Sequence, residues 1–156
     1  KVLISITDEL QSRKQILRTA GVANIDEYNH KAEEKLYRIV FACDEIAEVL
    51  DKTGLSKQQK DEILKIESEL SIIARQGRAF GIHLVLATQR PDAAILNGQI
   101  RNNIDTRICG RADNVLSQII LDNTDASDKI AKSSQGRFLT NSGKIFQAYW
   151  FDENIL

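Results

Sequence analysis

The sequence has 156 residues, of which 42% are hydrophobic and 28% charged, and its formal net charge is −1. This composition indicates one ordered globular domain over residues 1–156 with a sizeable core. It excludes a membrane span of about 20 apolar residues, and its near-neutral charge gives no global sign of nucleic-acid binding. The chain begins at Lys1 and contains no Met, so we expect an excised piece of a longer protein.

Predicted strands and helices alternate along the chain. Residues 2–6 are expected to form a short strand or an extended start. Capping and periodicity signals then predict helices at 8–20, 56–81 and 113–121. Short apolar runs predict buried strands at 38–43, 82–87 and 106–109. Strands at 138–140 and 145–150 flank the turn sequence Asn-Ser-Gly-Lys as a hairpin. The alternation predicts an α/β fold, with a mostly parallel sheet flanked by helices and a C-terminal β-hairpin.

Two adjacent carboxylates, Asp44 and Glu45, follow the predicted strand 38–43. The carboxyl end of a buried strand in such a sheet faces the ligand crevice. In P-loop nucleotide hydrolases an Asp at this place holds Mg²⁺, directly or through water, and a following Glu can orient and polarise the attacking water. The alternative is that the two acids only cap the next helix.

A phosphate-binding loop should accompany these carboxylates, with the pattern Gly-x-x-x-x-Gly-Lys-[Ser/Thr]. The nearest candidate combines Gly136 with Gly143 and Lys144, but its spacing is too long and Ile145 replaces the Ser or Thr. The sequence therefore contains no phosphate loop. We expect the carboxylates to serve a nucleotide that a missing upstream part would bind.

A polar pair, Thr88 and Gln89, ends the predicted strand 82–87. Such a pair is expected beside a nucleotide γ-phosphate, where an amide can sense the phosphate or orient water. Thr88 is therefore a candidate for nucleotide binding and Gln89 a candidate catalytic residue. The alternative is ordinary turn chemistry before Arg90 and Pro91.

All six Lys or Arg residues from Arg75 to Arg111 are arginines. Planar guanidinium groups suit phosphate or carboxylate recognition, and the alternative is a solvated face. Arg107 begins a predicted buried strand, so it needs a partner. That partner is either the γ-phosphate at a neighbouring subunit of a ring ATPase, which makes Arg107 an arginine finger, or an acid of the same chain. Arg75, Arg78 and Arg101 are further candidates for the same role in trans or for contacts between subunits.

The two cysteines, Cys43 and Cys109, each lie in a predicted strand. Their number and spacing provide neither a disulfide framework nor a metal site. They are therefore interpreted as small core residues in a reducing cytoplasm. His83, inside an apolar strand, is likewise interpreted as a hydrogen-bonded core residue.

Four stretches resemble the FtsK/SpoIIIE family of hexameric DNA-pumping ATPases, namely residues 21–29, 39–48, 77–91 and 102–108. The most specific is 77–91, GRAFGIHLVLATQRP. The resemblance covers most of the chain and implies the C-terminal half of a RecA-like P-loop motor domain, without its Walker A loop. The tail, from 135 to 152, resembles the shorter FtsK-like proteins of Gram-positive conjugative elements.

The resemblance also implies roles and partners. Asp44 would bind Mg²⁺ through water, Glu45 would be the catalytic carboxylate, Gln89 the sensor and Arg107 the finger acting in trans. ATP and Mg²⁺ would be the cofactors, and double-stranded DNA would pass through a hexamer pore by phosphate contacts. This chain would be cytoplasmic, with any membrane anchor in regions outside it.

Two other functions stay open from the sequence. A related ATPase of type VII protein secretion shares similar stretches around Asp44 and Thr88 but moves polypeptide. A non-hydrolytic ring-assembly module is the third possibility, although a dead site need not keep both Asp44 and Glu45.

Overall fold

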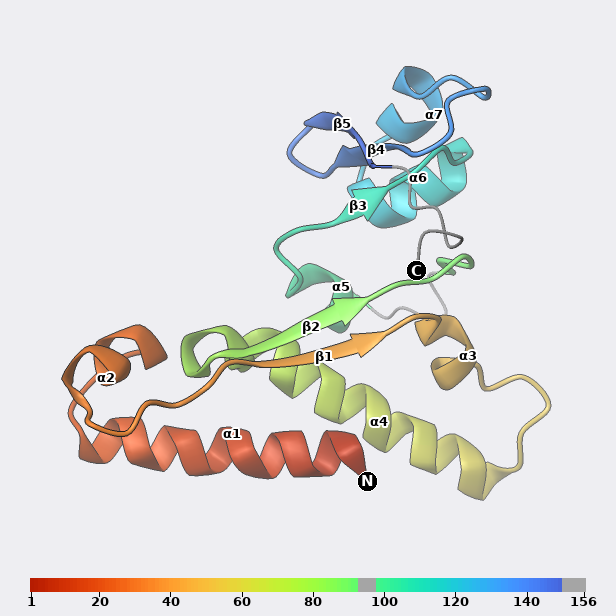
Figure 1. Cartoon of the computed structure of the whole chain (residues 1–156). Coiled ribbons are helices and arrows are strands. Elements are labelled where there is room, and N and C mark those ends of the chain that lie inside the picture. Colours follow the sequence, from red (N-terminus) through yellow and green to blue (C-terminus); the bar gives the residue numbers. More distant parts are fainter. Residues whose placement is uncertain (93–97, 150–156) are drawn as a thin grey trace, which may run out of the picture. The chain divides into compact units, whose positions relative to one another are not determined.

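The computed structural model describes residues 1–92 and 98–149, which form two compact units (Figure 1). Among the described residues, the first unit comprises 1–90 and 98–103, and the second comprises 91–92 and 104–149. Each unit has its own sheet and its own hydrophobic cluster, so each is described by itself. No helix in these ranges has the length and apolar character needed to cross a membrane.

The first unit is built on two parallel strands, β1 (Ile39–Cys43) and β2 (Ile82–Leu86), paired in register along their whole length. Both strands lie within the predicted runs 38–43 and 82–87, so their position and parallel direction are confirmed. Burial is one-sided, because Val40 on β1 is 61% exposed and Val85 on β2 is 55% exposed. Among the described residues, the expectation that these strands are buried is therefore met on one face alone.

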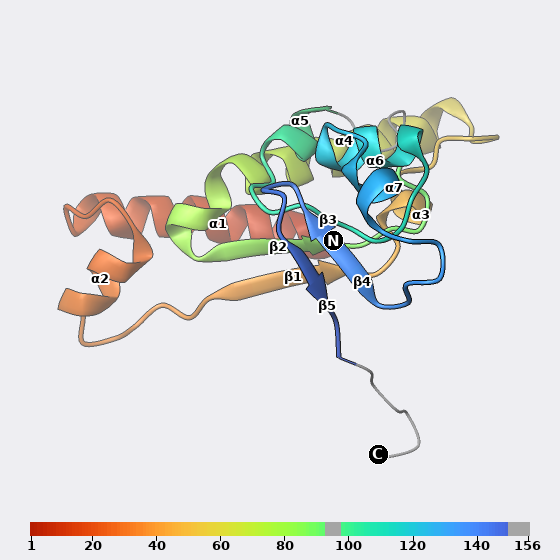
Figure 2. The same ribbon diagram turned by 90° about the horizontal axis from the view of Figure 1, so that it is seen from above.

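Two long helices, α1 (Val2–Thr19) and α4 (Lys57–Gln76), lie on the same side of the strands, as Figures 1 and 2 show. Apolar side chains from both helices and both strands pack into one cluster, and its members include Ile6, Leu10, Ile73, Ile82, Ile39, Phe41 and Leu84. Burying each large aliphatic side chain stabilises the unit by roughly 1.5–3 kcal/mol. This cluster fixes the strands from which the site residues emerge.

The helix α1 begins earlier than the sequence analysis expects. Residues 2–6 are helical, so the predicted extended start is wrong, and Asp8 lies inside the helix instead of capping it. Ile6, Leu10 and Leu17 are buried along one helical face, so packing outweighs the β-propensity of the apolar start. The predicted stop is confirmed, because Gly21 follows the helix with φ of 64°.

The helix α4 confirms its predicted start. Ser56 accepts a hydrogen bond from the Gln59 N–H, and the Gln59 side chain accepts from the Ser56 N–H, which is a capping box. After Gln76 the chain continues as a 3₁₀ turn, η1 (Gly77–Phe80), and stops at Gly81 with φ of 72°. Three short helices complete the unit: α2 (Ile25–Lys31), α3 (Ile46–Leu50) and α5 (Gly98–Asn102).

Gly77 allows α4 to approach β2 closely. A Cβ added at Gly77 would lie 2.5 Å from the Ile82 carbonyl oxygen, which is a backbone atom that cannot rotate away. We expect Gly77→Ala to destabilise the chain by about 1–3 kcal/mol, at about 2–4 °C of Tm for each kcal/mol. Thermal unfolding followed by circular dichroism would measure the change. Gly98→Ala is the control, since its Cβ would meet nothing nearer than 3.9 Å; a Gly77→Ala chain as stable as the control would contradict this reading.

The second unit contains a three-stranded antiparallel sheet in the order β3 (Ile108–Cys109), β4 (Arg137–Thr140) and β5 (Ile145–Gln147). The predicted hairpin is confirmed as β4 and β5, although its expected end at residue 150 lies outside the described residues. The strand predicted at 106–109 pairs with this hairpin and not with β1 or β2. The expected mostly parallel sheet is thus confirmed only in part, since within residues 1–92 and 98–149 β1 and β2 are the one parallel pair.

Asn141 explains the pairing of the third strand. Its side chain accepts a hydrogen bond from the Arg107 N–H at 3.1 Å and donates one to the Asp105 carbonyl at 3.1 Å, so the hairpin turn holds the segment before β3. The cluster below the sheet contains Cys109, Leu121, Ala126, Ile130 and Leu139, and burial raises the pKa of the Cys109 thiol. Two helices complete the unit: α6 (Asn114–Leu121), capped as predicted by Asp113, and α7 (Asp125–Lys129).

Candidate functional site

The carboxyl ends of β1 and β2 lie side by side and carry the predicted site residues. Beyond the strands, the Ala87 N–H donates to the Cys43 carbonyl at 2.8 Å, and the Ile46 N–H donates to the Ala87 carbonyl at 2.9 Å. These two bonds fix the backbone on both sides of Asp44 and Glu45. The parallel arrangement thus brings residues 44–45 against residues 88–89, which are more than 40 positions away in the sequence.

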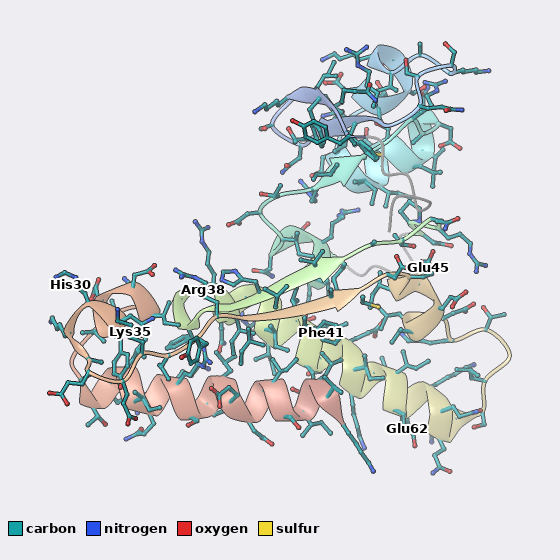
Figure 3. All side chains as sticks on the ribbon, viewed as in Figure 1. His30, Lys35, Arg38, Phe41, Glu45 and Glu62 are labelled. Atoms are coloured by element: carbon teal, nitrogen blue, oxygen red, sulfur yellow. The ribbon has the colours of Figure 1, made fainter. Side chains whose placement is uncertain are left out.

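Glu45 lies where β1 passes into α3 (Figure 3) and accepts three hydrogen bonds. The Thr88 hydroxyl and the Ala47 N–H, at 3.1 Å, donate to its Oε1, while the Gln89 N–H donates to its Oε2 at 2.8 Å. The bond from Thr88 is the main cause that lowers the pKa of the Glu45 carboxyl, followed by the bond from the Gln89 N–H. Glu45 is therefore an anion at neutral pH.

The helix-capping alternative is also present in the structure. The Ala47 N–H belongs to the first turn of α3, so Glu45 is the N-cap residue of that helix. Capping of the next helix and a place in the strand-end site do not exclude each other. The Glu45 carboxylate accepts the Ala47 N–H of the helix and also bonds to Thr88 and Gln89.

Asp44 differs from its neighbour. Its side chain is exposed, and it forms no hydrogen bond or ion pair with the described residues. A carboxylate in this condition suits Mg²⁺, which prefers oxygen ligands, keeps several waters and is commonly held by one or two carboxylates together with substrate phosphates. No group of three or more His, Cys, Asp or Glu side chains within 1–92 and 98–149 could hold a metal, so phosphate and water oxygens would have to complete the coordination.

The structure places Thr88 and Gln89 against Glu45. The Thr88 hydroxyl also accepts the Arg90 N–H at 3.0 Å, so the turn chemistry considered for this segment is observed as well. Gln89 reaches Glu45 through its backbone N–H, and its side chain is exposed. The contact between Thr88 and Glu45 is not among the expectations drawn from the sequence. The signal that could have found it was the rule that neighbouring parallel strands end at the same edge.

Arg107 lies in the second unit, where it has a partner. Its side chain is 17% exposed, and its Nη2 donates to Asp122 Oδ2 at 2.6 Å. Its Nε and Nη1 have no hydrogen-bond partner among the described residues. The intrachain ion pair considered for Arg107 is therefore observed in this state of the chain.

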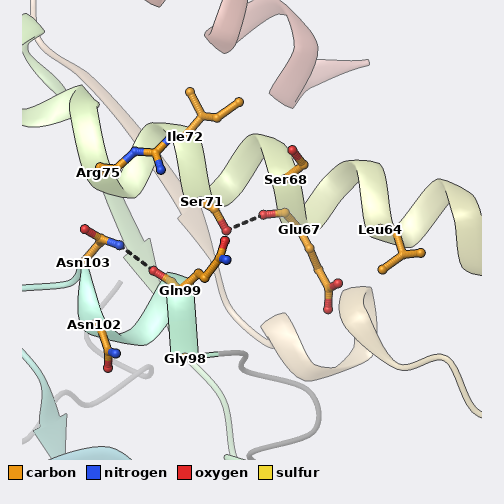
Figure 4. A pocket seen from close by; sticks show the side chains of 10 residues that line it. All are labelled: Leu64, Glu67, Ser68, Ser71, Ile72, Arg75, Gly98, Gln99, Asn102 and Asn103. Carbon is orange, nitrogen blue, oxygen red and sulfur yellow. Dashed lines mark hydrogen bonds between the residues drawn. The ribbon is translucent and has the colours of Figure 1, made fainter.

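A concave region in the first unit lies between α4 and α5 and has a volume of about 750 Å³ (Figure 4). Most of its lining residues are polar, and they include Ser71, which donates to the Glu67 carbonyl at 2.8 Å, and Asn103, which donates to the Gln99 carbonyl at 2.7 Å. Arg75 also lines it, but Asp44, Glu45, Thr88 and Gln89 do not. The pocket is thus separate from the strand-end site.

Comparison with known proteins gives no matching family model. A DNA translocase FtsK of Chlorobaculum tepidum is 34% identical over 145 residues, which are 92% of this chain and 16% of that protein. DNA translocase SftA of Bacillus subtilis is 32% identical over 145 residues, 89% of this chain and 14% of that protein. The chain thus spans about one sixth of the length of the curated relatives it matches.

Two solved structures are also similar. The monomer form of the pCW3 conjugation coupling protein TcpA, with ATPγS, is 42% identical, has a TM-score of 0.91, and is matched over 99% of this chain and 45% of its own. The cytoplasmic domain of the Thermomonospora curvata type VII secretion ATPase EccC has a TM-score of 0.71, with 97% of this chain and 18% of that chain covered. Its identity of 22% supports a common fold alone.

Proposed function

This chain is related in sequence to the FtsK/SpoIIIE family of DNA translocases, and we propose on that basis that it is part of an ATP-driven motor for double-stranded DNA. The observation that carries the proposal is the strand-end site, where an exposed Asp44 stands beside a Glu45 fixed by Thr88 and Gln89. The likeness to TcpA, whose structure contains ATPγS, supports a nucleotide at a fold of this kind.

The residues at the strand ends have distinct roles in this proposal. Asp44 holds Mg²⁺ through water, and Glu45 orients and polarises the attacking water. Gln89 senses the γ-phosphate, with Thr88 next to it. When bound at these residues, ATP would supply the phosphoryl group and Mg²⁺ would neutralise the charge that develops on it.

The phosphate-binding loop is the part that this sequence lacks. We therefore propose that residues 1–156 are one part of a RecA-like P-loop motor domain and that they hydrolyse no ATP by themselves. In the full-length protein the motor assembles as a ring, and DNA passes through its pore. The segment lies on the cytoplasmic side, and any membrane anchor belongs to other regions.

Protein secretion is the main competing function, since the fold likeness to EccC is also extensive. The FtsK and SftA relatives, which are more than 30% identical, are DNA translocases, which favours DNA as the cargo. A ring-assembly module without hydrolysis is disfavoured by the intact pair of Asp44 and Glu45.

DNA dependence of ATP turnover tests the proposal. We expect duplex DNA to stimulate turnover by the purified full-length protein several-fold at low salt, and to do so less at high salt, because phosphate contacts weaken as salt rises. A heparin control at matched charge would reveal nonspecific polyanion effects. Turnover that is indifferent to duplex DNA would move the assignment to protein secretion, and absent turnover would favour the assembly module.

A further inference from the structure

The hydroxyl of Thr88 has a defined direction. It accepts a hydrogen bond from the Arg90 N–H at 3.0 Å, and it also contacts Glu45 Oε1. A backbone N–H can only donate, and an ionised carboxylate can only accept, so the single hydroxyl proton of Thr88 must point to Glu45. Ser at position 88 could make both bonds, whereas Val, which has nearly the same shape, could make neither.

Three hydrogen-bond donors already contact the Glu45 carboxylate, two of them from the segment that follows β2. A carboxylate has about four lone-pair positions. The Thr88 hydroxyl and the Ala47 N–H take both positions on Oε1, and the Gln89 N–H takes one on Oε2. One position therefore remains for a water. The carboxylate is thus directed toward Thr88 and Gln89 and toward the first turn of its own helix, whereas the Asp44 side chain is exposed.

We propose that Thr88 and Gln89 form a clasp that holds Glu45 in a resting orientation, with Thr88 as its positioning residue. Opening the clasp frees the carboxylate to face the attacking water. Ala87 forms backbone hydrogen bonds with Cys43 and Ile46, and these bonds do not involve the side chains of Glu45 or Thr88. The strand ends can therefore stay paired while the clasp opens by a rotation of the Glu45 side chain and a small shift of residues 88–89. Because Gln89 is the proposed γ-phosphate sensor, nucleotide contact at Gln89 acts directly on the clasp. This inference rests on the proposed function.

Substitution of Thr88 in the full-length protein tests the clasp. We expect Thr88→Val to raise kcat for ATP in the absence of DNA by about tenfold and to reduce the further stimulation by duplex DNA. Thr88→Ser, which keeps the hydroxyl, should restore the wild-type rate. A turnover by Thr88→Val that equals or falls below that of the wild type would overturn the clasp.

Two controls separate failure of the clasp from failure of the proposed function. If the wild type lacks DNA-stimulated turnover, or if Glu45→Gln keeps it, the proposed function fails. If both behave as proposed while Thr88→Val resembles the wild type, only the clasp fails.

Hydrogen exchange provides a readout that needs no activity. Glu45→Ala should accelerate exchange of the Gln89 backbone amide, which loses its acceptor. The matched variant Asp44→Ala should leave that amide unchanged, since Asp44 makes no bond to the described residues. Equal exchange at Gln89 in the wild type and Glu45→Ala would overturn the clasp whatever the turnover rates.

Discussion

Glu45→Gln should lower ATP turnover of the full-length protein by about 10²- to 10⁴-fold, the range that a positioned acid–base group contributes. The amide has nearly the shape of the carboxylate but neither its charge nor its second acceptor oxygen. Its one oxygen can still accept the Thr88 hydroxyl or the Ala47 N–H, so the strand ends should stay in place. ATP turnover would be measured with and without duplex DNA. Binding of a fluorescent ATP analogue would be measured in parallel, and we expect Glu45→Gln to retain this binding.

Glu48→Gln is the matched control for this substitution. Glu48 lies one turn further along α3, is 71% exposed, and within the described part of the chain forms an ion pair with Arg90 alone, at 3.9 Å. We expect its loss to change turnover less than twofold, because exposed ion pairs contribute little. Turnover that survives in Glu45→Gln, or that falls equally in Glu48→Gln, would remove Glu45 from the catalytic role.

Local signals in the sequence predicted those elements whose structure depends on neighbouring residues. The Ser56 capping box and the apolar runs of β1 and β2 are of this kind, because cap geometry and strand burial are set within a few positions. Residues 2–6 show the limit of such signals. Their apolar, β-branched sequence favours a strand, and only packing of Ile6 and Leu10 against distant residues makes them helical.

Pairing between distant segments was less predictable. The strand at residues 106–109 has the composition of a sheet-core strand, but Asn141 holds the preceding segment to the hairpin, so the strand joins the antiparallel sheet. No spacing rule connects positions 107 and 141. The sequence predicts that β1 and β2 are parallel strands. The side-chain contact between Glu45 and Thr88 depends also on the register of the two strands, which the structure provides.

Arg107→Ala should lower turnover by about 10³- to 10⁵-fold if Arg107 acts as an arginine finger for a neighbouring subunit. Its guanidinium is paired with Asp122 here, so the proposed role requires that this pair open when the ring assembles. The Asp122 side chain is 52% exposed, which makes the pair accessible to exchange with another anion. Asp122→Asn removes the competing charge and should leave turnover within a few-fold of the wild type, while thermal unfolding of both variants would report any loss of stability.

Mixing two inactive variants decides whether Arg107 acts in trans. In a ring with head-to-tail contacts, a subunit carrying Arg107→Ala keeps Glu45, and a neighbour carrying Glu45→Gln keeps Arg107. Random mixing of equal amounts should therefore restore about a quarter of the wild-type sites. If Arg107 acts within its own subunit, or only stabilises the second unit through Asp122, no mixed ring contains a complete site and turnover stays absent. Recovery on mixing would thus establish the intersubunit role even though the isolated chain holds Arg107 in an internal ion pair.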